Sequence, residues 1–274
     1  MAADLRPEIT EELVRRLVAA QFPQYADLTV SKVEPGGNDN RTFRIGTRLL
    51  ARLPSATGYV ASVDKEHRWL PGLAAHLSIA IPAPVGLGAP GEGYPFPWSI
   101  YGWLDGVDLN AATSVDRPQL ARDLARFIRS LHAVDATGGP MAGEHSFYRG
   151  ASLLHYDAET REAPRFDRHA ERIWDAALAS EWPHPPVWFH GDIAPGNILI
   201  SNARLSAMID FGTSGVGDPA CDLVIAWTFF TPEERAIFAA EVDLDDDTWA
   251  RARGWALWKA LITGDARVIG EVLD

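Results

Sequence analysis

Apolar residues recur at two different spacings along this chain, and the spacing changes near residue 105. A helix is predicted after Thr10, a suitable cap, because the apolar positions that follow share one face: Leu13, Val14, Leu17 and Val18. Three β-type runs with short loops then predict an antiparallel meander: Leu28–Val33, Arg41–Ile45 and Arg48–Leu53. A helix over Ala61–His76 and a strand over Trp98–Leu104 follow, with five prolines between residues 79 and 98 that interrupt any helix.

Helical spacing dominates beyond that point. Apolar residues repeat at the spacing of a core-facing stripe after Pro118, at Leu120, Leu124, Phe127, Ile128 and Leu131. Further helices are predicted at 167–180, 219–229, 232–241 and 248–262, with a small hairpin from Asn197–Ile200 and Leu205–Ile209. The pattern therefore predicts an α+β fold, with a sheet-rich lobe over residues 1–104 and a helical lobe over 105–274.

Composition narrows the class of protein. The 274 residues are 47% hydrophobic and 23% charged, which is ordinary for a globular chain. A net charge of −12 argues against a nucleic-acid partner; it suits a cationic substrate, although solubility alone also explains it. The lone Cys221 excludes a disulfide framework and a thiolate zinc site. Residues 1–16 hold no continuous apolar run, so we expect a cytoplasmic protein without a membrane partner.

Two clusters of polar residues in the second lobe carry the chemistry. His190, Asp192 and Asn197 form an H-x-D-x-x-x-x-N pattern between apolar strands, and Asp210-Phe211-Gly212 follows the next strand. Phosphoryl transfer needs these types, because one carboxylate accepts the proton of the attacking hydroxyl while an amide oxygen and a second carboxylate hold magnesium. The alternative, in which Asp192 and Asp210 only cap turns, requires both to fall on adjacent strands by coincidence.

Here the sequence resembles the aminoglycoside phosphotransferase family, whose members are relatives of protein kinases. The resemblance covers residues 28–262, and glycine after His190, where kinases have arginine, indicates the small-molecule branch. It implies a protein-kinase-like bilobal fold, ATP or GTP as donor, Asp192 as catalytic base, and Asn197 and Asp210 as Mg²⁺ ligands. It also implies that His190 and Asp222 support the catalytic loop. The segments that carry it are Phe189-His190-Gly191-Asp192, Asn197-Ile198-Leu199, Ile209-Asp210-Phe211-Gly212, Gly217-Asp218-Pro219 and Asp222-Leu223.

The resemblance places the nucleotide in the first lobe. The segment Gly36-Gly37-Asn38-Asp39-Asn40 lies between two predicted strands, where Gly37, Asn38 and Asp39 would cover phosphates; a plain hairpin turn is the alternative. Arg52 occupies the strand position where the family usually has lysine, and Glu66 occupies the helix position that pairs with it. A guanidinium can grip two phosphate oxygens, whereas an edge arginine can also simply extend to water.

The contacts to the adenine and to the acceptor depend on less specific residues. Tyr101 and Trp103 lie where the interlobe strand of the family offers backbone groups to adenine, although their rings also suit a core. Thr213 stands where several aminoglycoside enzymes have arginine, so a cation from this turn is not expected. Since the family builds its acceptor pocket from acidic positions, candidates for binding ammonium groups are Asp157, Glu159 and Glu162, and the cluster Asp243, Asp245, Asp246 and Asp247. For the cluster, the alternative is a solvated turn that caps the helix from Thr248.

The leading interpretation is an ATP-dependent O-phosphotransferase whose acceptor is a hydroxylated small molecule, first among them a cationic, aminoglycoside-type antibiotic. The same fold also suits a macrolide, a peptide antibiotic, or a metabolite such as an amino alcohol or a sugar, because loops without fixed letters determine acceptor specificity. A nucleotide-binding pseudoenzyme would be expected to lack Asp192, Asn197 or Asp210, and all three are present. Donor choice and a resistance or biosynthetic role stay open.

Overall fold

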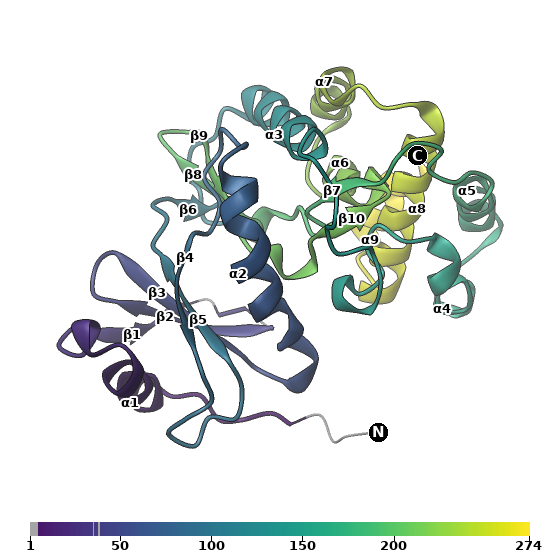
Figure 1. The fold of residues 1–274 in the computed structure, drawn as a ribbon. Helices are drawn as coiled ribbons and strands as arrows, with labels where there is room; N and C mark the ends of the chain where they lie inside the picture. Colours follow the sequence, from purple (N-terminus) through teal and green to yellow (C-terminus); the bar gives the residue numbers. More distant parts are fainter. Residues whose placement is uncertain (1–4, 35, 38) are drawn as a thin grey trace. The chain divides into compact units, whose positions relative to one another are not determined.

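The computed structural model describes residues 5–34, 36–37 and 39–274 (Figure 1). The chain divides into two compact units: residues 1–75 with 80–105, and residues 76–79 with 106–274. Each unit folds around its own sheet and helices, so the α+β class expected from the sequence is confirmed.

The first unit is built on one antiparallel sheet. Its described strands stand in the order β1-β2-β3-β5-β4. They are β1 (Val30–Lys32), β2 (Asn40–Ile45), β3 (Leu49–Pro54), β4 (Pro84–Gly88) and β5 (Trp98–Gly102). The helix α1 (Glu11–Gln21) precedes β1, and α2 (Ala61–Ala74) connects β3 to β4. The predicted meander is confirmed, because β1, β2 and β3 pair antiparallel in sequence order. Thr10 caps α1 as expected, its side chain accepting from the Leu13 N–H.

Alternation along the strands gives this sheet two different faces. Ala51, Leu53 and Ile100 point into an apolar core that also contains the buried face of α1, including Val14 and Leu17. The neighbouring residues on β3 and β5 point the other way and meet α2, where Arg52 and Tyr101 approach Glu66. One face of the sheet is therefore a hydrophobic core, and the other carries charged groups under a helix.

Strand β4 lies in the proline-rich stretch for which no strand was predicted. It pairs only with β5 among the described strands, so it forms an edge of the sheet. Pro84 is its first residue, a position at an edge where the missing N–H costs no ladder hydrogen bond. The prolines therefore exclude a helix, as expected, without excluding a short edge strand.

The second unit is mainly helical, with two small sheets. β8 (Ile198–Ser201) pairs with β9 (Arg204–Met208) and with β6 (Val107–Asp108), and β7 (Val187–Phe189) pairs with β10 (Gly215–Gly217). The predicted hairpin at 197–209 is thus confirmed. The helices are α3 (Arg117–His132), α4 (Asp157–Glu162), α5 (Arg168–Leu178), α6 (Ile225–Thr228), α7 (Pro232–Val242), α8 (Asp246–Thr263) and α9 (Ala266–Leu273).

Two predicted features of this unit need correction. The helix predicted over 219–229 is a 3-10 turn, Pro219–Leu223, followed by the short α6; Asp218 caps the turn, and all five of its residues are buried. Packing, rather than helical propensity, therefore determines its geometry. In addition, α4 lies inside the segment 135–165 that was expected to be a loop, and α9 follows the last predicted helix.

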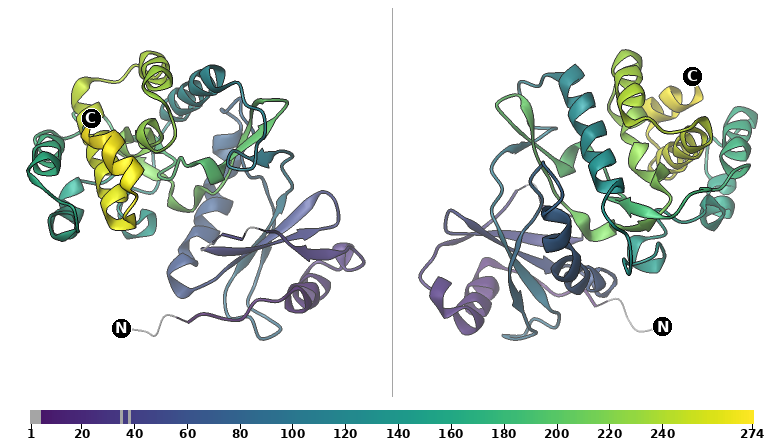
Figure 2. Two further views of the ribbon diagram at one scale, coloured as in Figure 1. Left: turned by 180° about the vertical axis from the view of Figure 1, so that it is seen from behind. Right: turned by 45° about the horizontal axis from the view of Figure 1, so that its top comes forward.

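Helix α8 is the central helix of this unit, packed against α5, α9 and the 219–223 turn (Figure 2). Gly254 permits its close approach to α5, because a Cβ built there would lie 2.5 Å from the Cβ of Ala177. On another side, Arg251 is buried and its Nε donates to Asp218 Oδ2 at 2.7 Å. These interactions fix α8 along its middle turns, directly before Trp255, Trp258 and Lys259.

Among the described residues, none of the helices is both long and apolar enough to span a bilayer.

Gly254→Ala tests the close approach of α8 to α5. The new methyl group would lie 2.5 Å from Ala177 Cβ and 3.0 Å from Leu153 Cδ1. Overpacking of this kind costs about 1–3 kcal/mol, which outweighs the helical preference of alanine over glycine. We expect a lower midpoint in thermal unfolding. The control is Gly270→Ala on α9, where a Cβ meets no atom within 4 Å; its midpoint should stay equal or rise.

Candidate active site

The turn after β7 is held by one buried carboxylate. Asp222 is fully buried, and its two oxygens accept from the backbone N–H groups of His190 (2.8 Å) and Gly191 (2.7 Å). Burial raises the pKa of Asp222 to about 7, against the lowering effect of these two hydrogen bonds. The carboxylate thus ties the 219–223 turn to the first residues of the H-x-D segment.

Side-chain and backbone contacts complete this turn. The buried His190 contacts the Ile209 carbonyl through Nε2 at 3.0 Å, and the Asp192 N–H lies 3.3 Å from its Nδ1. Gly191 has φ +84°, and a Cβ there would lie 2.9 Å from the Thr213 carbonyl oxygen. Glycine is therefore required at this position. Thr213 also donates from its hydroxyl to the His190 carbonyl at 3.0 Å.

Asp192 projects from this turn with both carboxylate oxygens engaged. Its Oδ2 accepts from Asn197 Nδ2 at 3.0 Å, and its Oδ1 lies 2.9 Å from Lys259 Nζ. About one third of the Asp192 side chain is exposed. The carboxylate is therefore oriented from two sides while it remains accessible to a ligand.

The charge state of Asp192 follows from these contacts. Partial burial raises the pKa of the carboxyl, but the charge and the hydrogen bond of Lys259, with smaller effects of His190 and Arg149, lower it further, so the net pKa is below the ordinary value of 3.8. At neutral pH Asp192 is an ionised carboxylate.

Asn197 and Asp210 are brought together by the hairpin β8–β9. The Ile209 N–H donates to the Asn197 carbonyl at 2.9 Å. Asp210, the residue after Ile209, therefore lies close to the end of the Pro195–Asn197 turn. Asp210 has φ +63°, a left-handed conformation that aspartate tolerates and that directs the chain into the 211–213 turn.

This donor set suits magnesium. Asn197 donates from its nitrogen to the backbone and side-chain oxygens of Asp192, which directs its amide nitrogen to Asp192 and leaves the amide oxygen as the atom that could bind a metal. An amide oxygen and the Asp210 carboxylate are hard donors of the kind Mg²⁺ takes together with substrate phosphates. Among the described residues, no group of three or more His, Cys, Asp or Glu side chains could hold a metal alone.

In the first unit, Arg52, Glu66 and Tyr101 form a second polar cluster. Arg52 Nη1 lies 3.4 Å from both Glu66 oxygens, longer than the 2.7–2.9 Å of a tight charge-assisted pair. The Tyr101 hydroxyl donates to Glu66 Oε2, and the Arg52 guanidinium lies 5.9 Å from the Tyr101 ring. Glu66 and Tyr101 are buried, so the pair predicted from sequence is formed inside the unit.

The remaining nucleotide residues predicted from sequence fall into three situations. Gly37 and Asp39 lie in the connection between β1 and β2, which was expected to be a hairpin. Gly37 is exposed, and the Asp39 carbonyl accepts from the Ser55 N–H. Asn38 lies outside the described residues. Tyr101 uses its hydroxyl on Glu66, as described. The Trp103 N–H donates to the Arg48 carbonyl, and Arg44 covers the Trp103 ring at 4.1 Å. That N–H is therefore already bonded, and an adenine contact on this strand stays a prediction for its other backbone groups.

The acidic residues expected to bind the acceptor have partners within the protein. Asp157 accepts from Arg161 Nε at 2.8 Å and from the Trp174 indole at 2.7 Å. Glu159 accepts from the Trp258 indole at 2.7 Å. Glu162 is exposed on α4. Asp157 and Glu159 thus position neighbouring side chains, and a direct role in binding ammonium groups stays a prediction.

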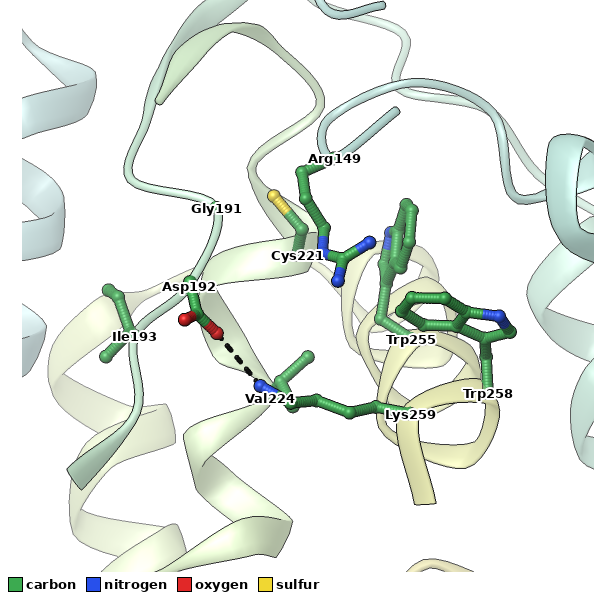
Figure 3. Close-up of a pocket in the computed structure, with 9 residues that line it drawn as sticks. All are labelled: Arg149, Gly191, Asp192, Ile193, Cys221, Val224, Trp255, Trp258 and Lys259. Atoms are coloured by element: carbon green, nitrogen blue, oxygen red, sulfur yellow. Dashed lines mark hydrogen bonds and ion pairs between the residues drawn. The ribbon is translucent and has the colours of Figure 1, made fainter. Parts of the chain in front are cut away.

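The structure adds residues that the sequence analysis missed. A hollow beside Asp192 is lined by Arg149 and by Trp255, Trp258 and Lys259 of α8 (Figure 3). One available signal was the spacing of the last three, which places 255, 258 and 259 on one helical face. The other was the scarcity of lysine, since Lys259 is one of three in the chain. Arg149 carried no signal of its own, because it lies in a long connection.

Comparison with solved structures defines the class of protein first. The GDP complex of aminoglycoside 2'-phosphotransferase-IIIa superposes with a TM-score of 0.73 at 22% identity, covering 97% of this chain and 96% of that one. Macrolide 2'-phosphotransferase MphH from Brachybacterium faecium gives 0.64 at 24% identity, over 96% and 97%. The fold is thus that of the kinase-like small-molecule phosphotransferases, as predicted.

Sequence comparison gives the family. A model of the phosphotransferase enzyme family, APH, matches residues 31–255, and the chain belongs to this family. An aminoglycoside 3'-phosphotransferase of Escherichia coli is 29% identical over 111 residues, which are 38% of this chain and 41% of that enzyme. The chain spans about half the length of the curated relatives that it matches.

Asp222→Ala tests the anchoring role of this carboxylate. The substitution leaves two buried N–H groups without acceptors, at about 1–3 kcal/mol each. We expect a corresponding loss in the free energy of unfolding, measured with urea.

The pH dependence gives an independent check on Asp222. The folded carboxyl keeps its proton up to about pH 7, whereas the unfolded one releases it near 3.8. The unfolded state therefore binds fewer protons over this range, and stability relative to Asp222→Asn should fall as the pH rises from 4 to 7, then level off. A stability difference that grows with pH would contradict the raised pKa.

Proposed function

We propose that this protein transfers the γ-phosphoryl group of a nucleoside triphosphate to a hydroxyl group of a small molecule. The observation that carries the proposal is the arrangement of Asp192: an ionised carboxylate, partly exposed, held by Asn197 and Lys259 on a turn that Asp222 fixes. A carboxylate oriented in this way is what phosphoryl transfer requires of a protein, because positioning and charge neutralisation supply most of the catalysis.

Asp192 acts as the base in this proposal. The acceptor oxygen forms a bond to the γ-phosphorus, the bond from that phosphorus to the β–γ bridging oxygen breaks, and the nucleoside diphosphate leaves. The acceptor proton passes to a carboxylate oxygen of Asp192 and from there to solvent. Because Lys259 lowers the pKa of Asp192, the carboxylate is a weak base whose main contribution is to orient the hydroxyl while the new bond forms.

Asn197 and Asp210 hold magnesium in the proposal. The metal, when bound, neutralises phosphate charge as it develops. The support is the chemistry of the two side chains. The Asn197 nitrogen donates hydrogen bonds to Asp192, so the amide oxygen is the atom of Asn197 that can bind the metal.

The donor nucleotide is assigned to the first unit. Arg52 is the cation for the α- and β-phosphates, and Glu66, oriented by Tyr101, holds it in place. Support comes from the long contacts between Arg52 and Glu66, which leave the guanidinium able to turn its fork toward an oxyanion. Neighbouring structures with bound GDP or ADP support a nucleotide of either base.

The acceptor is the least determined part of the proposal. Neighbouring structures include an aminoglycoside 2'-phosphotransferase with GDP and kanamycin and a macrolide phosphotransferase, which supports an antibiotic acceptor of the aminoglycoside type first and of the macrolide type second. The same chemistry applies to a peptide antibiotic or a metabolite. The residues around Asp192 bear on this choice.

Asp192→Asn is the direct test of the base. The amide keeps the shape and the contact with Asn197 but cannot accept a proton, so turnover should fall at least 100-fold, in keeping with the usual contribution of a general base of about 10²–10⁴. Nucleotide affinity should stay within a few-fold. The measurement is release of nucleoside diphosphate across an acceptor panel, with fluorescent-nucleotide titration alongside. Near-normal turnover would overturn the assignment.

Asp210→Ala serves as the matched comparison in the same assay. Its loss should appear as weaker magnesium-dependent nucleotide binding rather than as lost proton transfer. If the magnesium dependence is unchanged, Asp210 is not a metal ligand.

Arg52→Met tests the nucleotide site. The substitution keeps the length of the side chain and removes its charge, so the KM for the nucleotide should rise at least tenfold, because charged hydrogen bonds contribute about 1.5–3 kcal/mol. Arg52→Lys should recover part of this loss by restoring the charge without the fork. Equal affinity in wild type and Arg52→Met would remove Arg52 from the site.

A further inference from the structure

The hollow beside Asp192 is positively charged in an acidic protein. Its lining contains three ionised side chains, those of Asp192, Arg149 and Lys259, so its formal charge is +1, whereas the whole chain carries −12. Asp192 and Lys259 form an ion pair at 2.9 Å and largely neutralise each other. Among the described residues that line the hollow, Arg149 is therefore the cation that no carboxylate of the lining neutralises.

Aromatic side chains fix the position of Arg149. Its guanidinium carbon lies 4.4 Å from the Trp258 ring and 5.5 Å from the Trp255 ring, both on α8. Figure 3 shows the side chain extending from its loop toward the space between Asp192 and these two rings. Its Nη1 donates to the Phe147 carbonyl at 3.3 Å. Arg149 is also hydrogen-bonded to the Tyr156 side chain. A guanidinium has five N–H donors, so these two bonds still leave enough for a bidentate contact with an oxyanion.

The nearby acidic groups lie outside the lining of the hollow. Asp157 is paired with Arg161 and Asp218 with Arg251, whereas Glu159 accepts from the Trp258 indole, which carries no charge. The buried Asp222 faces the backbone of the loop and not the hollow. An acceptor with several ammonium groups would therefore meet the cations Arg149 and Lys259 beside Asp192. Among the described residues of the lining, the one carboxylate is that of Asp192, which is already paired with Lys259.

We propose that Arg149, with Trp255 and Trp258, forms an acceptor subsite for an anionic group, so that the acceptor is a hydroxylated carboxylate or phosphate ester rather than a polycationic aminoglycoside. The guanidinium binds the oxyanion, the indole rings contact the apolar part of the acceptor, and Asp192 takes the hydroxyl. Like charges at the entrance supply discrimination against amines. The inference rests on the proposed function of Asp192 but concerns only what lies beside it.

A binding experiment tests the subsite without requiring turnover. The protein is titrated with benzoate, benzamide and benzylamine, which share one ring and differ in charge, and binding is followed by ligand-observed NMR. Benzoate should bind at least tenfold more tightly than benzylamine, and Arg149→Met should remove this preference. Arg149→Lys should retain part of it. The matched control is Arg172→Met, at an exposed arginine of α5 in the same unit, which should bind benzoate like wild type.

Three outcomes of this titration would overturn the inference: no binding of benzoate, equal or tighter binding of benzylamine, or benzoate binding that Arg149→Met does not change. Nucleotide affinity is measured in the same variants. If Arg149→Met weakens the nucleotide and leaves benzoate unchanged, the cation serves the phosphates of the donor and the acceptor subsite is disproved.

A transfer experiment separates this inference from the proposed function. Wild-type protein with magnesium and ATP or GTP is given 3-phenyllactate, its neutral amide, and kanamycin. Phosphorylation of the acid in preference to its amide, lost in Arg149→Met, supports the subsite; efficient phosphorylation of kanamycin that Arg149→Met does not impair overturns it. If none of the compounds is phosphorylated while benzoate binds as expected, the subsite stands on the binding result and only the proposed transfer is weakened.

Discussion

A single buried carboxylate determines the geometry on which the rest of the candidate site depends. Asp222 receives two consecutive backbone N–H groups, so the chain after β7 can follow only one path, and Asp192 leaves that path at a fixed point. Burial raises the pKa of this carboxyl, because the charged form is removed from water. The requirement for glycine at 191 has the same origin, because the turn leaves no space for a side chain.

The sequence predicted those parts of the site whose members are close along the chain. His190, Asp192 and Asn197 lie within eight residues of the chain, and Asp210 comes shortly after β9, which pairs with β8. The local pattern and one hairpin were therefore sufficient to group these residues. Lys259 was missed for a physical reason: α8 is buried on most of its sides, so its sequence gives no clear amphipathic direction from which to infer where a given residue points. Likewise, the prolines before residue 98 excluded a helix but did not reveal the edge strand β4.

The net charge of the chain was a poorer guide to the site than the spacing of its residues. Net charge sums over the whole surface and says little about one hollow, where a few side chains determine the field. In this protein Asp157 and Glu159 of α4 accept hydrogen bonds from Arg161, Trp174 and Trp258, so they hold aromatic and basic groups in place. Counting carboxylates along a segment does not show whether they face a ligand or a neighbour, and only the fold settles that question.

The position of α8 links packing in the interior to chemistry at the surface. The same helix makes the close approach at Gly254, forms the buried pair of Arg251 with Asp218, and presents Lys259 to Asp192. A rotation of this helix by a fraction of a turn would move the aromatic and basic groups together. Substitutions at Ala177 on α5, which never touches the hollow, therefore offer evolution a way to retune the preferred acceptor while every residue of the H-x-D segment stays unchanged.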